Sequence, residues 1–297
     1  MSKIEKALSK AREERGNLQV VPFRDSAARS STGTAVVAYR SGHPETIARM
    51  AASEARLLGP GDLSERGIIH TANIDDPAVQ MFRELRTKIV QQCKGSNSVI
   101  LVTGVSKGSG SSFVAQNLGA AFAFDKVKTA LVIDCNFKDP SMHRLVGKAS
   151  APGLTDYLEN PDIDIGSIIH PVGIARFRVI PAGTRPTTET EHFTSMKMTQ
   201  LIDTVRRRYT ERFVILDAPP MSDISDIRIL SEFADYVLVV ARYGRVTNVQ
   251  IDKCVSAFSD KKLLGIVFND EPRMPRKLRP AYAARSVVRG DPRGPGG

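Results

Sequence analysis

Short apolar runs alternate with amphipathic segments between residues 75 and 272, and this alternation predicts an α/β fold. Each apolar run is rich in Val, Ile, Leu or Phe, which is typical of strands buried in a parallel sheet. The predicted strands are 98–103, 129–133, 177–181, 212–216, 236–241 and 264–268. The predicted helices are 75–93, 112–124, 191–207, 224–232 and 247–258. We therefore expect a doubly wound, mostly parallel sheet that binds ligands at the carboxyl ends of its strands.

The same pattern divides the chain into four parts. Residues 1–16 predict a short amphipathic helix, with apolar side chains on one face and charges on the other. Residues 17–73 lack sustained periodicity and predict a disordered linker, with one helix at 45–57. The α/β domain follows at 74–272. The Pro-, Arg- and Gly-rich residues 273–297 predict a disordered basic tail.

The net charge of +10 is concentrated at the ends of the chain. Residues 71–272 hold 24 basic and 23 acidic residues, whereas residues 273–297 hold seven basic residues and one acidic residue. Such a tail attracts anionic lipid, nucleic acid or an acidic partner without specificity. The chain has no tryptophan and no recognisable RNA-recognition, zinc-finger or helix-turn-helix motif. We therefore expect no specific nucleic-acid partner.

Cysteine use and hydropathy predict the compartment. The three cysteines, Cys93, Cys135 and Cys254, are scattered and form no CxxC pair, as expected of reduced thiols in a cytosol. No apolar run approaches the length of a membrane span, and the first residues lack the apolar segment of a signal peptide. We expect a cytoplasmic protein that reaches the inner face of the membrane only through a partner.

A glycine- and serine-rich loop gives the first candidate site. Residues 99–112 read VILVTGVSKGSGSS, so that an apolar strand leads through this loop into a predicted helix. Main-chain N–H groups in such a loop, together with the helix N-terminus, bind phosphates. Gly108 and Gly110 let the backbone approach phosphate oxygens, and Ser112 stands where a hydroxyl binds Mg²⁺. However, Ser111 occupies the position at which an ATP-hydrolysing P-loop carries its lysine.

Two carboxylates end predicted strands beside this loop. Asp134 closes the run ALVID, and Asp217 closes the run FVILD before Ala-Pro-Pro. An acid at either place can hold a metal-bound water or orient a nucleophile, although a lone strand-end aspartate is as often a turn residue. Two acids and a phosphate-binding loop on neighbouring strands together predict a magnesium–nucleotide site.

At this point the chain resembles the cytoplasmic domain of the bacterial tyrosine kinases (BY-kinases) of polysaccharide synthesis and export. These belong to the same P-loop superfamily as the deviant Walker ATPases of cell division and plasmid partition. The segments that carry the resemblance lie within residues 74–272, in the order and spacing of the family: FRELRTKI, ALVIDCNFKDPSMH, PGLTDYLEN, FRVIPAGTRP and FVILDAPP. The first residues, MSKIEKAL, are similar to the start of stand-alone kinases encoded at exopolysaccharide loci.

The resemblance implies ATP or ADP and Mg²⁺ as ligands, and it assigns their residues. Asp134 and Asn136 match catalytic positions, and Ser112, Asp134 and Asp217 match magnesium positions. The residues implied to bind nucleotide are Lys107, Gly108, Ser109, Gly110, Ser111, Ser112, Phe113 and Asn269. Asp226 matches a further acid after the second carboxylate strand, although an acid at a helix N-terminus has the same appearance.

Several positions depart from the family pattern. Ser111 replaces the P-loop lysine, Asn136 replaces an acid, and Lys138 replaces an arginine. The family tail carries a cluster of tyrosines that are autophosphorylated, whereas here only Tyr282 lies in the tail. A preorganised electrostatic contact of the kind lost at Ser111 contributes roughly 3–4 kcal/mol to a transition state, or about 10²–10³ in rate. The sequence therefore predicts a pseudo-kinase or a weak kinase.

The implied role is a BY-kinase-like component of exopolysaccharide synthesis or export. Its implied partner is a membrane co-polymerase or chain-length protein, and Arg83 and Arg86 match the family's oligomerisation helix. One alternative is an active tyrosine autokinase in which Lys107 replaces the missing cation and Tyr282 accepts phosphate. The other alternative is a partition-type surface ATPase whose basic tail binds DNA or lipid.

Overall fold

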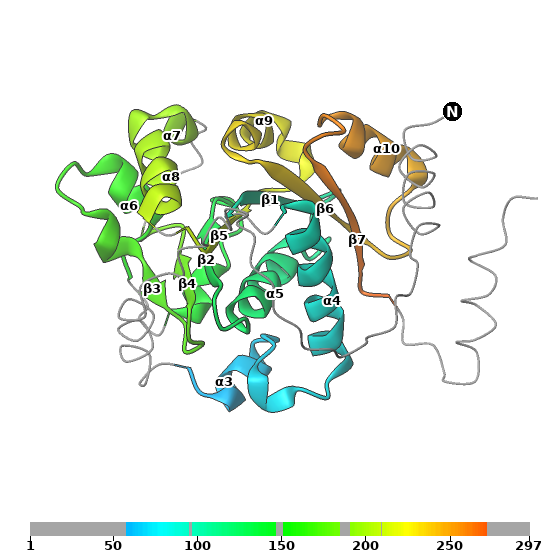
Figure 1. Ribbon diagram of the computed structural model, residues 1–297. Coiled ribbons are helices and arrows are strands. Elements are labelled where there is room, and N and C mark those ends of the chain that lie inside the picture. Colours follow the sequence, from blue (N-terminus) through cyan, green and yellow to red (C-terminus); the bar gives the residue numbers. More distant parts are fainter. Residues whose placement is uncertain (1–57, 95–96, 147–150, 185–190, 209, 272–297) are drawn as a thin grey trace, which may run out of the picture.

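The computed structural model describes residues 58–94, 97–146, 151–184, 191–208 and 210–271 (Figure 1). The predicted helices at 1–16 and 45–57 lie outside the described residues, as does the predicted basic tail with Tyr282.

A seven-stranded sheet forms the centre of the described domain, in the order β3-β4-β2-β5-β1-β6-β7. Its strands are β1 (Val99–Gly104), β2 (Thr129–Asp134), β3 (His170–Pro171), β4 (Phe177–Ile180), β5 (Arg212–Asp217), β6 (Tyr236–Arg242) and β7 (Leu263–Asn269). All neighbouring strands are parallel except β3 and β4. The predicted doubly wound, mostly parallel fold is therefore confirmed. The two-residue β3 was not predicted, because so short a strand has no periodicity to detect.

Most predicted helices are present with shifted ends. The α-helices are α3 (Pro60–Glu65), α4 (Pro77–Gln92), α5 (Ser111–Ala123), α6 (Leu154–Glu159), α7 (Glu191–Thr194), α8 (Met196–Arg208), α9 (Ile224–Phe233) and α10 (Asn248–Ser256). Short 3₁₀ turns occupy η1 (Thr71–Asn73), η2 (Met142–Leu145), η3 (Ile165–Ile168) and η4 (Met221–Asp223). The predicted helix 191–207 is divided at Ser195, whose hydroxyl accepts a hydrogen bond from the Met198 N–H at 3.2 Å and so begins α8.

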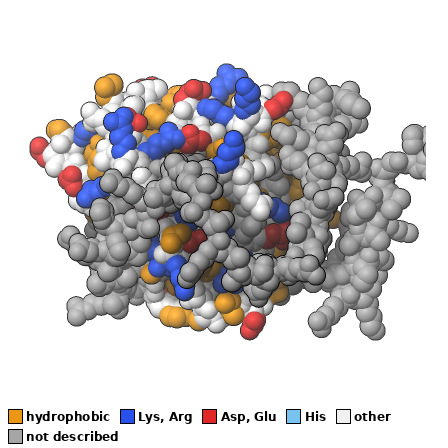
Figure 2. Space-filling view, in the orientation of Figure 1, with side chains coloured by type: hydrophobic (Ala, Val, Ile, Leu, Met, Phe, Trp, Pro, Cys, Tyr) orange, Lys and Arg blue, Asp and Glu red, His pale blue; other side chains and the backbone are white. Residues whose placement is uncertain are grey.

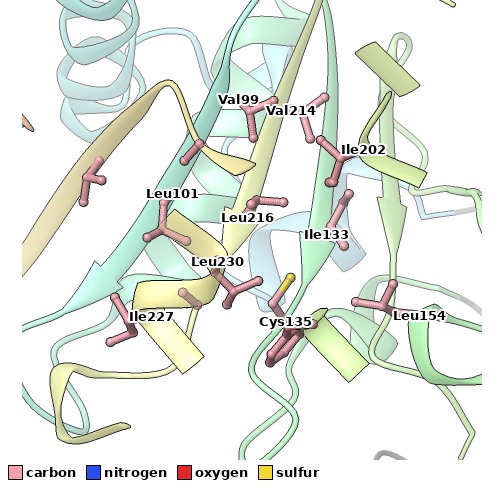
Figure 3. Packing of buried hydrophobic residues seen from close by; sticks show 14 of the residues in the cluster. Val99, Leu101, Ile133, Cys135, Leu154, Ile202, Val214, Leu216, Ile227 and Leu230 are labelled. Atoms are coloured by element: carbon pink, nitrogen blue, oxygen red, sulfur yellow. The ribbon is translucent and has the colours of Figure 1, made fainter. Parts of the chain in front are cut away.

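Helices cover both faces of the sheet, as Figure 1 shows. Helices α4 and α5 lie on one face, and α8, α9 and α10 lie on the other. Figure 3 shows the second face, where Leu101 and Leu216 from the central strands approach Leu230 of α9. Alternate residues of the strands point to opposite faces, so each buried strand contributes to both hydrophobic clusters.

Helix α5 is enclosed on all sides, and this corrects the predicted domain boundary. On the sheet side Gly119 is required, because a Cβ there would lie 2.6 Å from the Phe177 ring. On its outer side α5 is covered by α4 and by residues 58–73, in which Leu63, Ile68 and Ile69 are buried. The expectation of a disordered linker up to residue 73 is therefore wrong for residues 58–73. Their few apolar side chains complete the core over α5.

Asn117 of α5 holds this covering segment by hydrogen bonds. Its side chain is fully buried, and its Oδ1 accepts from the Ile69 N–H at 2.8 Å. Its Nδ2 donates to the Gly67 carbonyl at 3.0 Å and to the Phe113 carbonyl at 3.0 Å. One amide side chain therefore satisfies main-chain groups of the segment that would otherwise be buried without partners.

The charged side chains that are visible on the described surface are mixed. Figure 2 shows Lys and Arg interspersed with Asp and Glu on the upper part of this face, where Figure 1 places α7 to α9. This mixture agrees with the near balance of 24 basic and 23 acidic residues between residues 71 and 272.

Asn117→Ala is expected to lower the free energy of unfolding by about 2–3 kcal/mol, because the Ile69 N–H remains buried without an acceptor. Urea unfolding followed by circular dichroism measures the change. Asn248→Ala is the control, since Asn248 is exposed at the first position of α10 and should change stability by less than about 0.5 kcal/mol. Equal stabilities of the two variants would show that Asn117 does not fasten the segment.

Candidate functional site

The register of the parallel strands brings the two predicted acids together. Strands β2 and β5 are neighbours, and Asp134 is paired with Asp217 at their carboxyl ends. Asp217 is also in register with Val102 of β1, the strand that leads into the glycine-rich loop. Both carboxylates are fully buried, with 0% relative exposure. The structure therefore places both acids at the carboxyl ends of neighbouring strands, where the sequence predicts them.

The loop 104–112 joins β1 to α5 in a phosphate-binding shape. Gly108 and Gly110 have φ angles of 76° and 83°, which favour glycine, and Gly110 directly precedes α5. Within the described part of the chain, the main-chain N–H groups of Gly108, Gly110, Ser111 and Ser112 donate no hydrogen bond. Unpaired donors at the positive end of a helix dipole attract an anion.

Two side chains fix the shape of this loop. The Ser109 hydroxyl donates to the Ser106 carbonyl at 2.6 Å and accepts from the Ser106 N–H at 3.1 Å. The Asn269 amide, at the end of β7, donates to the Ser109 carbonyl at 3.1 Å. A Cβ at Gly110 would collide with the Asn269 amide nitrogen. Asn269, which the resemblance places near the nucleotide, therefore acts in this structure on the loop itself.

Asp134 is satisfied within the protein. Its carboxylate accepts main-chain hydrogen bonds from Asn136 at 3.2 Å, Ser141 at 2.8 Å and Met142 at 2.9 Å. Burial raises the pKa of Asp134 to about 6, and these three hydrogen bonds oppose that rise. Asp134 thus holds the turn that follows β2, in addition to any role toward a ligand.

Asp217 is not satisfied. Neither of its carboxylate oxygens has a hydrogen-bond partner of acceptable geometry. Burial first, and then the neighbouring Asp134 carboxylate, raise the pKa of Asp217 well above the usual range, while the Ser112 side chain lowers it. A fully buried carboxylate without a partner is costly to ionise, so the geometry favours either a proton or a cation at this place.

A third unpaired oxygen belongs to Asn136. This residue is 7% exposed, and its Oδ1 is buried without a partner. Among the described residues, no group of three His, Cys, Asp or Glu side chains forms a preformed metal site. Proteins usually hold Mg²⁺ through one or two of their own oxygen atoms, while water and phosphate oxygens complete its coordination. The donor set therefore fits a magnesium ion that arrives with a nucleotide.

The other predicted loop residues differ in their surroundings. Lys107 is exposed and forms no ion pair with any described residue. Ser111 is half-buried at the first position of α5. The Phe113 ring packs edge-to-face on Phe82 of α4, with ring centroids 5.9 Å apart. The loop therefore carries a cation only at Lys107, and the Phe113 ring contacts a helix of the core.

A lysine connects the loops that follow the two acidic strands. Lys138 Nζ lies 2.6 Å from Asp223 Oδ1, and this hydrogen bond raises the pKa of Lys138. Asp223 directly precedes α9, and Asp226, three residues later in the first turn of this helix, is buried. Asp226 was predicted from the sequence as a candidate site residue, whereas Asp223 was not. Asp223 is the first acidic residue after Asp217 in the sequence, and this position could have identified it as a candidate.

The predicted oligomerisation residues contact their own chain. The Arg86 guanidinium donates to the Ala121 carbonyl at 3.1 Å, and Arg83 lies 5.9 Å from the centroid of the Phe124 ring. Gln80 lies three residues before Arg83 on α4, and its side-chain amide donates to the Ile74 carbonyl at 3.0 Å. All three side chains therefore stabilise the packing of α4 within the domain.

Known proteins share both sequence and fold with the chain. The tyrosine-protein kinase wzc of Salmonella typhimurium is 31% identical over 205 residues, which are 68% of this chain and 28% of that protein. The EpsB protein of Ralstonia nicotianae is 33% identical over 215 residues, which are 71% of this chain and 28% of that protein. The chain thus spans less than a third of the length of these relatives. No protein-family model matches the sequence.

Solved structures agree with this similarity. The kinase domain of the Escherichia coli tyrosine kinase ETK has a TM-score of 0.61 and 27% identity, and the match covers 69% of this chain and 80% of that chain. The chimerical protein CapA2B2 has a TM-score of 0.62 and 26% identity, with 69% and 93% covered. Within the described residues, each helix is too short or too polar to cross a bilayer.

The pKa shifts predict how stability depends on pH. A carboxyl group whose pKa is higher in the folded protein than in the unfolded chain binds more protons when folded, so stability falls as pH rises through that interval. For Asp134 the interval runs from about 4 to about 6, and for Asp217 it also begins near 4. The contribution of these two groups therefore favours the folded state most on the acidic side of this window.

Asp217→Asn is expected to raise the free energy of unfolding at pH 7.5 by about 1–3 kcal/mol, because it removes an unpaired buried charge. The difference from wild type should shrink toward pH 4, where Asp217 is protonated. Urea unfolding in EDTA at both pH values measures it, and Asp162→Asn, an exposed acid, is the control. A variant that is less stable than wild type at pH 7.5 would contradict this account of Asp217.

Proposed function

The chain belongs to the bacterial tyrosine kinase (BY-kinase) family, and we propose that its domain binds a magnesium–nucleotide complex but transfers phosphate poorly or not at all. The observation that carries the proposal is Asp217, a buried carboxylate with two unpaired oxygens in register with Asp134 and next to Ser112. A site of this kind is stabilised by a proton or by a cation, and a magnesium ion beside phosphate supplies the cation. The neighbouring loop offers unpaired N–H groups to phosphate.

The residues divide between the two components of the ligand. The N–H groups of Gly108, Gly110 and Ser111 would hold the phosphates, and Ser112 and Asp217 would hold the magnesium ion. A bound Mg²⁺ neutralises phosphate charge and polarises the transferring phosphoryl group. Asp134 keeps the turn after β2 in place through its three main-chain hydrogen bonds.

The residues of the same site explain why phosphoryl transfer should be weak. Ser111 cannot supply the positive charge of the P-loop lysine, which is worth roughly 3–4 kcal/mol in a transition state. Asn136 cannot act as a general base, because an amide does not accept a proton near neutral pH. Lys138 is engaged with Asp223, so it does not replace the missing lysine in this arrangement. We therefore infer a pseudo-kinase or a very weak kinase.

The family suggests where such a protein acts. We propose a role in exopolysaccharide synthesis or export, in the cytoplasm, through contact with a membrane co-polymerase or chain-length protein. Nucleotide binding would then control a contact with the partner protein near the proposed nucleotide site. Self-association through Arg83 and Arg86 also belongs to the proposal, and it would require these side chains to leave their contacts with Ala121 and Phe124.

Calorimetry with Mg-ADP and Mg-ATP on the full chain tests the binding proposal. Ser111→Lys is expected to tighten the affinity by about 10²-fold, because it restores the ammonium group at the phosphates. Ser256→Lys adds the same charge at an exposed position on α10 and should leave the affinity unchanged. No binding to wild type and no gain in Ser111→Lys would refute a nucleotide site.

One observation supports the active autokinase as a second candidate. Lys107 is exposed on the loop and free of ion pairs with described residues, so its charge is available to a phosphate. If the kinase is active, radiolabelled ATP should label wild type, Tyr282→Phe should lose the label, and Lys107→Ala should lower the rate by about 10²-fold. Unlabelled wild-type protein would exclude this candidate and leave the pseudo-kinase.

A further inference from the structure

The two edges of the central sheet differ in how well they are protected against pairing with further chain. One edge is β3, which has only two residues, His170 and Pro171, and pairs with β4 alone. So short a strand with a proline offers few main-chain groups to another strand. The other edge is β7, whose seven residues, LLGIVFN, include no charged residue and no proline. The β7 edge therefore lacks the shortness, the charges and the prolines that usually prevent pairing at a sheet edge.

Residues 265–269 of β7 direct alternate main-chain groups away from the sheet. The Tyr243 N–H donates to the Asn269 carbonyl at 2.8 Å, so the main chain of Asn269 faces β6. Because the hydrogen-bonding side alternates along a strand, the N–H groups of Ile266 and Phe268, here called the outward amides, point away from β6. No described strand lies on that side of β7, which is the last strand of the sheet in Figure 1. The outward amides and the carbonyls of the same residues therefore have no partner strand within the described domain.

Side chains of the same stretch leave apolar surface at this edge. Phe268 is 53% exposed, and its register partner on β6 is Ala241, which packs on the face of the sheet that α10 covers. Ile266 is half-buried on the same face. A Cβ at Gly265 would meet nothing within 4 Å, so the space beside this backbone is open to another chain. A further strand at β7 would cover apolar surface as well as pair main-chain groups.

A run of strand-forming residues lies in the part of the chain before residue 58. Residues 34–39 read TAVVAY, and most of them are β-branched or aromatic. The run contains no charged residue and no proline, and Gly33 and Gly42 lie on either side of it, as is typical of a strand bounded by turn residues. Its length is close to that of β7. This run therefore has the composition and the length to pair with the β7 edge.

The chain between this run and the domain is long enough to reach β7. Residues 40–57 join the run to Leu58, and they can extend to about 60 Å. The described domain has about 200 residues, which corresponds to a radius of gyration of about 16 Å and a width of roughly 40 Å. Leu58 packs against the cluster that includes α4 and α5, on one face of the sheet. The run can therefore reach the β7 edge of its own domain.

The covalent connection favours this run over a second copy of the protein as the partner of β7. A tethered segment that can span the distance has an effective concentration in the millimolar range at its site. A second molecule in dilute solution is present at a much lower concentration. Pairing within one chain is thus favoured without any additional contact.

We propose that residues 34–39 pair with the outer edge of β7 as a further strand of the sheet. The outward amides and the neighbouring carbonyls bond to this strand, and its valines and Tyr39 pack beside the exposed Phe268 ring. Extended peptides bind to exposed sheet edges in this way, with main-chain hydrogen bonds for affinity and side-chain contacts for specificity. The pairing fixes the first part of the chain at the edge of the sheet opposite to β3.

Amide hydrogen exchange of the full 297-residue chain, followed by NMR without nucleotide, tests the pairing. Val36→Pro/Val37→Pro removes two consecutive N–H groups, so one that faces β7 is lost in either register. The outward amides should exchange about tenfold faster, or more, in this variant than in wild type. Ala27→Pro/Ala28→Pro places two prolines outside the run and is the matched control, in which exchange should equal that of wild type.

A second variant tests the pairing from the side of the domain. Phe268→Lys places a charge at the outer edge of β7, as many natural edge strands do, and should make the Val36 and Val37 amides exchange about tenfold faster. Val249→Lys is the control, because Val249 is also apolar and exposed, on α10, and lies outside β7. Its exchange at Val36 and Val37 should equal that of wild type.

Two results would overturn the proposal: outward amides that exchange at the same rate in wild type and in Val36→Pro/Val37→Pro, and control prolines that act as strongly. In the first case light scattering shows whether a second copy covers β7 instead, because a dimer would protect the outward amides in both proteins. The amide of Leu101, in the central strand β1, should stay protected in every variant and shows that each is folded. If Phe268→Lys fails to fold, the proline variant alone decides.

Discussion

The buried register between β2 and β5 is the constraint on which the site depends. It places Asp134 beside Asp217 with no freedom to separate, because both strands lie in the middle of a seven-stranded sheet and are covered on both faces. Burial raises the pKa of both carboxyl groups, and the Asp134 carboxylate raises the pKa of Asp217 further, so this place attracts a proton or a cation. The hydrophobic packing of the sheet thus creates the electrostatic condition that a ligand would relieve.

The two acids are alike in sequence and different in environment. Asp134 is surrounded by three main-chain N–H donors, so its charge is already compensated by the turn that it stabilises. Asp217 has no such donors and faces Ser112 at the start of α5. A bound cation therefore gains more electrostatic stabilisation at Asp217 than at Asp134, although both residues are strand-end aspartates in the sequence.

Parts of the fold and site that follow from local pattern were predictable, and parts that follow from tertiary contact were not. The strands, the glycine-rich loop and the acids after β2 and β5 are all visible as short sequence patterns. Residues 58–73 looked like linker, because their buried apolar side chains are only Leu63, Ile68 and Ile69, and these follow no helical or strand period. The ordering of this segment depends on Asn117, a polar residue within an otherwise apolar helix.

If Ser111 stands where the family carries its P-loop lysine, as the sequence predicts, the exchange changes the electrostatic balance of the proposed nucleotide site more than its shape. The loop keeps its left-handed glycines and is braced by the Ser109 hydroxyl and the Asn269 amide without any help from position 111. What is lost is one positive charge next to two buried carboxylates. The compensating charge must then come from Lys107 or from a metal ion that enters with the nucleotide, so binding should depend on Mg²⁺ more strongly here than in a relative that retains the lysine.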